Sequence, residues 1–179
     1  MNRRQIVFIS FIAAMTVGSA VLLIFDTPRP HQGMHEYSLT SYTQLASVRN
    51  ALSRNPSVTK TDWEYVEIFY SRTSAGDMGT VAMFNNSSTE KDANLHFVIC
   101  NGEKNGAIQT SDRWRNQYRC LQGDNWYGSR KTIRICVIGH PIRALPSDTQ
   151  IKRAEDLVET LCKEYGIPKV NVSYPQGWN

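Results

Sequence analysis

The clearest pattern of hydrophobic and polar positions runs from Thr132 to Pro168. It begins with a short run rich in β-branched residues, Ile133–Gly139, which predicts a central strand covered on both faces. Ser147 and Gln150 form a capping box, and Gly166 offers the left-handed position that ends a helix. Between them, apolar residues recur at the spacing of one helical face: Ile151, Ala154, Leu157, Val158, Leu161, Cys162 and Tyr165. A strand leading into one amphipathic helix indicates a helix that lies on a sheet.

Other segments have weaker strand patterns. Trp63–Tyr70 alternates, with one face only partly apolar, and Leu95–Cys100 is the pattern of a second core strand. The Asn-Gly turn that follows predicts a returning strand at Gly106–Gln109, and Val170–Val172 predicts a last strand. Thr80–Asn85 fits a helix or a short strand equally well. The apolar spacing within Ser41–Ser53 predicts a short helix.

The N-terminal segment has a different character. Ile6–Phe25 is an uncharged, mostly apolar run of 20 residues, which is long enough to span a bilayer as a helix. Arg3 and Arg4 before it favour a cytoplasmic N-terminus and an exported C-terminal part. A cleaved signal peptide, with Gly18-Ser19-Ala20 as its cleavage site, is the alternative. We therefore expect a signal-anchor transmembrane segment at residues 1–25, a linker at 26–40 and an extracytoplasmic domain at 41–179.

Charge and cysteine content exclude some functions. The formal net charge is +4, and the basic residues are spread along the chain, so we expect no nucleic-acid partner. The four cysteines form no CxxC pair, which argues against a structural zinc site, while a disulfide stays open. Among the histidines, we interpret His96 as a core histidine bonded to backbone and His140 as a loop residue.

Ser111–Arg130 is the segment with the strongest suggestion of binding. It mixes arginines with aromatic residues: Arg113, Trp114, Arg115, Tyr118, Arg119, Trp126 and Arg130. Such a segment can bind a sugar, a peptide or nucleic acid, and it can equally be a loop packed on the surface of the domain.

Several blocks together resemble the type 2 N-acetylmuramoyl-L-alanine amidases, the family that includes the peptidoglycan recognition proteins. The blocks are Ile68–Thr73 (the first-strand motif), Leu95–Ile99 (the YHFVI motif), Arg113-Trp114 with Gln117, Ile133–Gly139 (the IGICLVG motif), Pro146–Gln150 and Tyr165–Pro168 (the start and end of the long helix). The resemblance covers Trp63 to Val172 and implies an α/β fold with a central mixed β-sheet flanked by helices.

The resemblance also implies a site, and the sequence departs from it there. The family holds a zinc ion between a histidine on the first strand and further ligands after the last strand. The matching positions are Phe69 and Ser173-Tyr174, and Leu95 stands in place of the family's catalytic tyrosine. Because an open zinc site needs about three donors, we expect no zinc and no other cofactor here.

The candidate cleft is inferred from the same matches. Its residues are Phe69, Tyr70, Arg72, Leu95, Arg113, Trp114 and Tyr174. The leading hypothesis is a catalytically inactive, membrane-anchored module that binds peptidoglycan or a muropeptide. The alternatives are an amidase with an atypical metal site, and a structural envelope protein that binds a protein partner.

Overall fold

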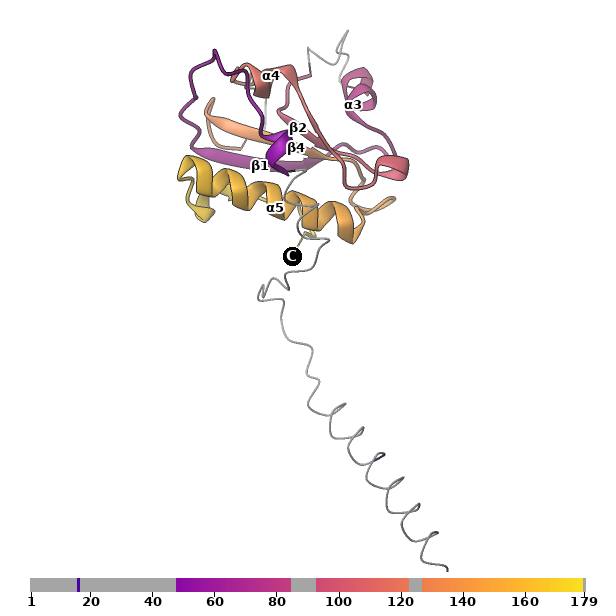
Figure 1. Ribbon diagram of the computed structural model, residues 1–179. Coiled ribbons are helices and arrows are strands. Elements are labelled where there is room, and N and C mark those ends of the chain that lie inside the picture. Colours follow the sequence, from indigo (N-terminus) through magenta and orange to yellow (C-terminus); the bar gives the residue numbers. More distant parts are fainter. Residues whose placement is uncertain (1–15, 17–47, 85–92, 123–126, 179) are drawn as a thin grey trace, which may run out of the picture. The chain divides into compact units, whose positions relative to one another are not determined.

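The computed structural model describes Thr16 and residues 48–84, 93–122 and 127–178 (Figure 1). All of these except Thr16 belong to one compact unit, Ser38–Asn179. The strands are β1 (Tyr65–Tyr70), β2 (Phe97–Ile99), β3 (Ile108–Thr110), β4 (Thr132–Val137) and β5 (Val172–Ser173). The helices are α3 (Met78–Phe84), α4 (Asp112–Arg115) and α5 (Asp148–Tyr165), with 3-10 turns at Gly102–Lys104 and Lys169–Asn171.

The five strands form one sheet in the order β3-β2-β4-β1-β5. β2, β4, β1 and β5 are parallel, and β3 pairs with β2 in the antiparallel direction. This confirms the predicted α/β fold with a mixed sheet flanked by helices. β4 and β1 lie at the centre, and β5 is an edge strand.

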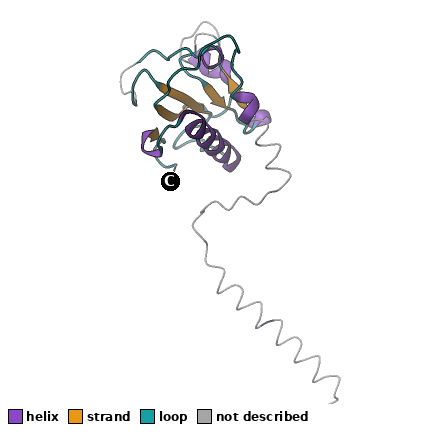
Figure 2. Cartoon of the chain, turned by 60° about the vertical axis from the view of Figure 1, so that its left-hand side comes forward, coloured by secondary structure: helices purple, strands orange, loops and turns teal. Residues whose placement is uncertain are grey.

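Alternation along the strands sends side chains into two layers. One face carries Val66, Ile68, Ile133 and Ile135, and α5 covers it (Figure 2). The other face packs under α3 with a second set of apolar residues: Met78, Val81, Ala82, Ala93, Leu95, Val98, Cys100, Cys136 and Ile138. β4 is therefore buried on both faces, as its sequence predicts.

The ends of α5 follow the predicted signals. The Ser147 hydroxyl accepts a hydrogen bond from the Gln150 amide, and Gly166 adopts φ 68° at the C-terminus. The Gln150 side chain also donates to the carbonyls of Ile99 and Ile138, at 3.3 and 2.8 Å. One residue thus caps the helix and ties it to β2 and to the chain after β4.

Several segments differ from expectation. The ambiguous segment after Gly79 is helical, as part of α3. The returning strand is Ile108–Thr110 and the last strand is Val172–Ser173, because a 3-10 turn occupies Lys169–Asn171. The predicted helix at Ser41–Ser53 is helical at residues 48–51, and its start lies outside the described residues.

The proposed membrane segment also lies outside the described residues, apart from Thr16, as do the whole linker at 26–40 and Trp126. Within the described ranges, no helix has the length and hydrophobicity to cross a membrane.

Candidate functional site

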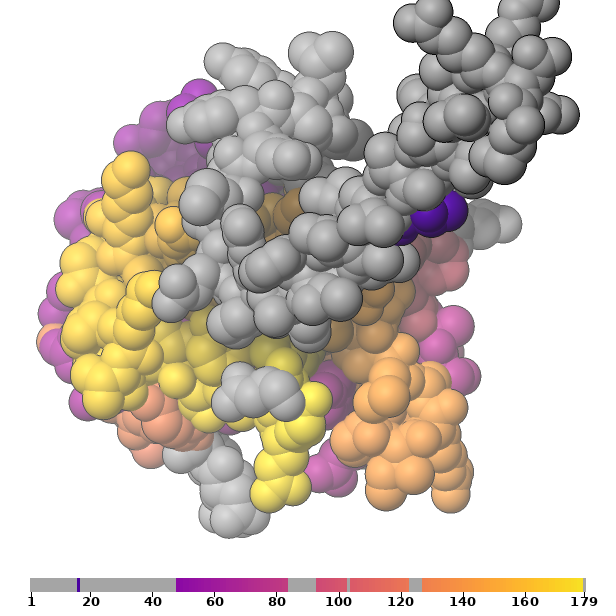
Figure 3. All heavy atoms as spheres, turned by 90° about the horizontal axis from the view of Figure 1, so that it is seen from below, coloured from indigo at the N-terminus to yellow at the C-terminus, as the bar shows by residue number. Residues whose placement is uncertain are grey.

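A groove of about 560 Å³ crosses the carboxyl end of β1, and we call it the β1 groove. Its lining residues are Ile68, Phe69, Tyr70, Ser71, Arg72, Val81, Arg134, Pro141, Ser173, Tyr174, Pro175 and Gln176. In Figure 3 the hollow lies between the C-terminal residues, in yellow, and the orange loop that follows β4. Crevices at the carboxyl ends of parallel strands are common ligand sites in α/β folds.

The turn after β1 fixes one wall of the groove. The Ser71 and Arg72 amides donate to the carbonyls of Val137 and Gly139, both at 2.9 Å, so β1 stays attached to the chain after β4. The Ser71 hydroxyl accepts from the Gly139 amide at 3.1 Å. Arg72 adopts φ 63°, a left-handed conformation that costs a non-glycine residue about 1–2 kcal/mol. Its side chain is exposed and makes no ion pair with another described residue.

An ion pair stacked on an aromatic ring forms the floor. Arg134 on β4 and Glu67 on β1 face each other in register, and the Arg134 Nε donates to Glu67 Oε2 at 2.7 Å. The same guanidinium donates to the Asn94 carbonyl at 2.9 Å and lies 4.4 Å above the Phe69 ring centroid. Only 18% and 13% of the two charged side chains are exposed. A held cation thus covers the ring of Phe69, the residue that the motif resemblance matches to the family's first zinc ligand.

The other wall is aromatic and comes from the C-terminal tail. The Trp178 ring lies between Tyr70 and Tyr174, with centroid distances of 6.1 and 6.5 Å. Tyr174 is 41% exposed, and burial raises the pKa of both phenols above the ordinary value. Both therefore stay protonated at neutral pH and can donate a hydrogen bond.

Four of the seven predicted site residues meet in this groove: Phe69, Tyr70, Arg72 and Tyr174. Leu95 does not line it, because its side chain is 1% exposed and packs in the layer under α3. The prediction that Leu95 lines the cleft is corrected accordingly.

Arg113 and Trp114 also lie elsewhere. The Arg113 side chain donates to the carbonyls of Ala93 and Arg119, at 3.0 and 3.2 Å. Trp114 is fully buried in the layer under α5, with its indole nitrogen donating to the Leu52 carbonyl at 3.3 Å. Neither side chain lines the β1 groove.

Zinc does not fit the groove as the described residues form it. Its lining offers hydroxyls, a glutamine amide and arginines, and Glu67 beneath it is already bonded to Arg134. In the described part of the chain, no three His, Cys, Asp or Glu side chains converge in a metal-binding arrangement. A tetrahedral zinc site needs about three such donors.

The two described histidines, His96 and His140, have hydrogen-bond partners within the protein. His96 is fully buried; its Nδ1 accepts from the Arg134 amide at 2.9 Å, and its Nε2 lies 3.1 Å from the Tyr118 carbonyl. This confirms the predicted core role. His140 Nδ1 accepts from the amides of Ile142 and Arg143, which organises the loop after β4.

The cysteines offer no reactive group either. All four lie in the described residues and are free thiols. Cys120 Sγ lies 3.7 Å from His96 Nδ1, the arrangement of a candidate nucleophile and base. However, burial raises the pKa of Cys120 to about 12 and lowers that of His96 to about 3, which keeps both groups neutral and unreactive.

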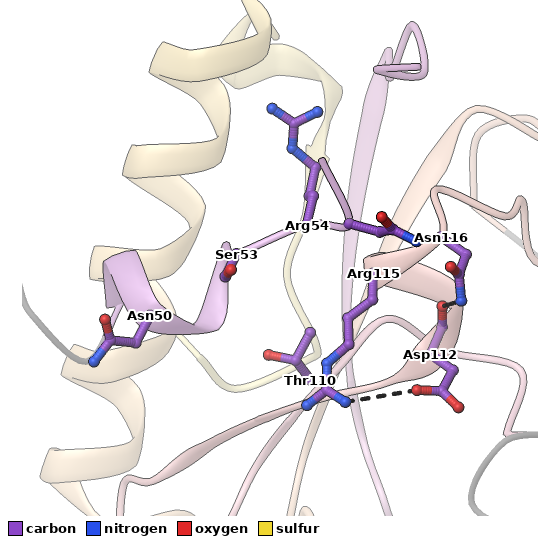
Figure 4. A pocket seen from close by; sticks show the side chains of 8 residues that line it. Asn50, Ser53, Arg54, Thr110, Asp112, Arg115 and Asn116 are labelled. Atoms are coloured by element: carbon purple, nitrogen blue, oxygen red, sulfur yellow. Dashed lines mark hydrogen bonds and ion pairs between the residues drawn. The ribbon is translucent and has the colours of Figure 1, made fainter. Parts of the chain in front are cut away.

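A second hollow, of about 500 Å³, lies between residues 50–55 and α4 (Figure 4). Its lining is entirely polar: Asn50, Ser53, Arg54, Asn55, Thr110, Asp112, Arg115 and Asn116. Its charges largely pair within the protein, with Arg115 reaching Asp112 and Arg54 reaching Glu164, both at 3.6 Å. None of the seven predicted site residues lines it, so a substitution there, such as Arg115→Ala, suits a control.

Sequence reasoning missed Arg134, Glu67 and Trp178. The signal for the first two was present, since both are charged residues inside strands that are otherwise apolar. A charge on a central strand needs a partner, and the opposite charge on the neighbouring strand supplies one.

The architecture defines an α/β domain with a groove at the carboxyl end of its first strand. A family model described as N-acetylmuramoyl-L-alanine amidase matches residues 59–173, which is more than half of the chain. The chain therefore belongs to the N-acetylmuramoyl-L-alanine amidase family, as the motifs suggest. A search of curated proteins finds no match.

Proposed function

We propose that this chain is a peptidoglycan-binding module of the amidase family that holds a muropeptide in the β1 groove without hydrolysing it. The observation that carries the proposal is the Arg134 guanidinium, held by Glu67 over the Phe69 ring where the family's first metal ligand would stand. The family's hydrolysis depends on a metal-activated water. Guanidinium and hydroxyl groups instead suit the binding of an anion.

Arg72 is the best candidate for the ligand's anchor. It is exposed at the mouth of the groove and forms no ion pair with another described residue. A left-handed arginine is strained, and strain of this kind is often retained where a side chain has a function. Stem peptides of peptidoglycan carry carboxylates, which a guanidinium binds through two parallel hydrogen bonds.

For location, we propose that residues 1–25 anchor the chain in a membrane with the family domain on the exported side, where peptidoglycan lies. The supporting feature is the uncharged run Ile6–Phe25 after Arg3 and Arg4.

The test is co-sedimentation of the full chain with purified sacculi. Arg72→Gly suits the left-handed backbone, so it removes the guanidinium without adding strain. Loss of a hydrogen bond to a charged group costs about 1.5–3 kcal/mol, so we expect binding to weaken by about 10- to 150-fold. Arg115→Ala, which removes an exposed arginine from the second hollow, should bind as the wild type does. Wild-type chain that stays in the supernatant, or Arg72→Gly that binds unchanged, would refute the proposal.

A further inference from the structure

The loop between β4 and α5 exposes two large aliphatic side chains. Ile142 is 86% exposed and Leu145 is 69% exposed. Arg143, next to Ile142, is also exposed and forms no ion pair with another described residue. No acidic residue occurs from His140 to Ser147, so the loop carries only positive charge. In Figure 3 this loop, in orange, stands out from the rest of the domain. Exposed apolar side chains gathered on a projecting loop are typical of an interaction site.

The amide groups at the tip of this loop are already bonded within the protein. His140 and Ala144 pair as a β-bridge, in which their amides donate to each other's carbonyls at 2.7 and 3.3 Å. His140 Nδ1 accepts from the amides of Ile142 and Arg143, both at 3.2 Å, and Pro141 has no amide hydrogen. Every backbone donor from residue 141 to residue 144 is therefore satisfied. Such a tip can leave water without stranding a donor, which is a requirement for entering a bilayer.

The N-terminal run of the chain indicates which surface lies within reach of the loop. With residues 1–25 in a membrane, as proposed above, residues 26–47 connect that segment to Val48, and a chain of this length spans at most about 75 Å. A tether raises the effective concentration of the loop at the lipid surface. Two aliphatic side chains and one cation are then enough for contact, although they are too few to hold an untethered domain there. Anionic lipid headgroups also complement the charge of Arg143.

We infer that Ile142 and Leu145 enter the headgroup layer of the membrane, with Arg143 bound to an anionic headgroup, and that this contact orients the domain on the bilayer. The inference rests on the anchor proposed under the function above and does not depend on what the β1 groove binds. Because Pro141 lines the β1 groove, the contact places one wall of that groove at the membrane surface. The groove then opens beside the bilayer.

The test is photo-crosslinking of the full chain, reconstituted in vesicles of phosphatidylcholine and phosphatidylglycerol. A benzophenone amino acid replaces residue 142 in one chain and residue 170 in another, and mass spectrometry measures the lipid adducts after irradiation. Val170 is the matched control, because it is 82% exposed and precedes β5, at the end of the parallel strands opposite to the loop. A tethered contact should give about fivefold more lipid adduct, or more, at position 142 than at position 170.

A second set of chains carries the benzophenone at position 145 and tests the side chains beside it. Arg143→Gln should lower the lipid adduct at 145 about fivefold, because it removes one charge from an anionic surface. Ile142→Ser should lower it about tenfold, because it removes an apolar side chain from the contact. Val170→Ser, which changes an equally exposed residue at the other end of the strands, should leave the adduct at 145 unchanged.

The outcomes separate this inference from peptidoglycan binding. Equal lipid adducts at 142 and 170, or an adduct at 145 that neither Arg143→Gln nor Ile142→Ser lowers, would refute the membrane contact while peptidoglycan binding stands. Adducts from position 142 to a second protein chain in place of lipid would also refute it, and would assign the loop to a protein interface. A full chain that does not float with the vesicles overturns the anchor and this inference together, whereas failure to sediment with sacculi overturns only the role proposed for the groove.

Discussion

Acid should destabilise this domain through His96, and the structure gives the size of the effect. Burial lowers the pKa of His96 from 6.5 to about 3. The Arg113 and Arg134 charges act in the same direction, and the bond to the Tyr118 carbonyl acts against them. A proton on Nδ1 would also turn the acceptor of the Arg134 amide into a donor, so that bond would be lost. The folded state therefore keeps His96 neutral.

The direction in which pH changes the stability follows from proton binding. Between pH 6.5 and about 3 the unfolded chain binds a proton at His96 that the folded chain does not, so stability falls as the pH falls through this window. Each pH unit corresponds to about 1.4 kcal/mol. Lowering the pH from 7 to 5 should therefore cost about 2 kcal/mol of unfolding free energy through this residue alone.

The assay is urea unfolding of the wild type and of His96→Gln at pH 7 and pH 5. Glutamine is polar but does not titrate, so the variant should lose about 2 kcal/mol less than the wild type between the two pH values. His140→Gln, in the loop after β4, is the control and should leave the wild-type loss in place. Equal losses for the wild type and His96→Gln would show that His96 is not buried as a neutral group.

Three further predictions follow from the packing and the groove. Leu161→Ala, at a position of α5 whose side chain is 0% exposed, should cost about 2–5 kcal/mol in urea unfolding, whereas Leu145→Ala, at 69% exposure, should cost almost nothing; equal costs would contradict the placement of α5. Glu67→Gln should cost about 3 kcal/mol because it leaves the Arg134 guanidinium without its carboxylate. Glu64→Gln, in an exposed pair, should stay under about 1 kcal/mol, and a similarly small cost at Glu67 would show that the floor is not held by this pair. Phe69→His should neither bind zinc stoichiometrically nor release stem peptides from sacculi, since the other donors are still missing; gain of either property would count against the assigned site.

The fold could be predicted well wherever the signals were local. The capping box, the apolar face and the terminal glycine of α5 all lie within one segment, so Ser147 and Gly166 mark its ends as predicted. β4 could be predicted because a strand buried on both faces is apolar throughout. The last strand was placed two residues early, because nothing in Val170–Val172 indicates the 3-10 turn at Lys169–Asn171.

The site could be predicted only in part. Phe69, Tyr70, Arg72 and Tyr174 meet because the motifs place them at the ends of neighbouring strands. The position of Leu95 was misjudged, because the motif gives its place in the chain but not the layer into which its side chain points. In the same way, the composition of Ser111–Arg130 does not show that Trp114 turns inward.

The site residues that the sequence did not predict are brought together by long-range contacts. Glu67 and Arg134 are 67 residues apart, and their pairing depends on β1 lying beside β4 in a particular register. Trp178 reaches Tyr70 only because β5 pairs with β1 at the sheet edge. Neither contact leaves a local pattern in the sequence.

The most direct test of the central claim is the release of stem peptides from purified sacculi by the full chain in a buffer that contains zinc. We predict release no greater than in a no-protein control, while the same chain sediments with the sacculi. Release above that control, in proportion to the amount of protein added, would show that the groove hydrolyses its ligand and would contradict the account.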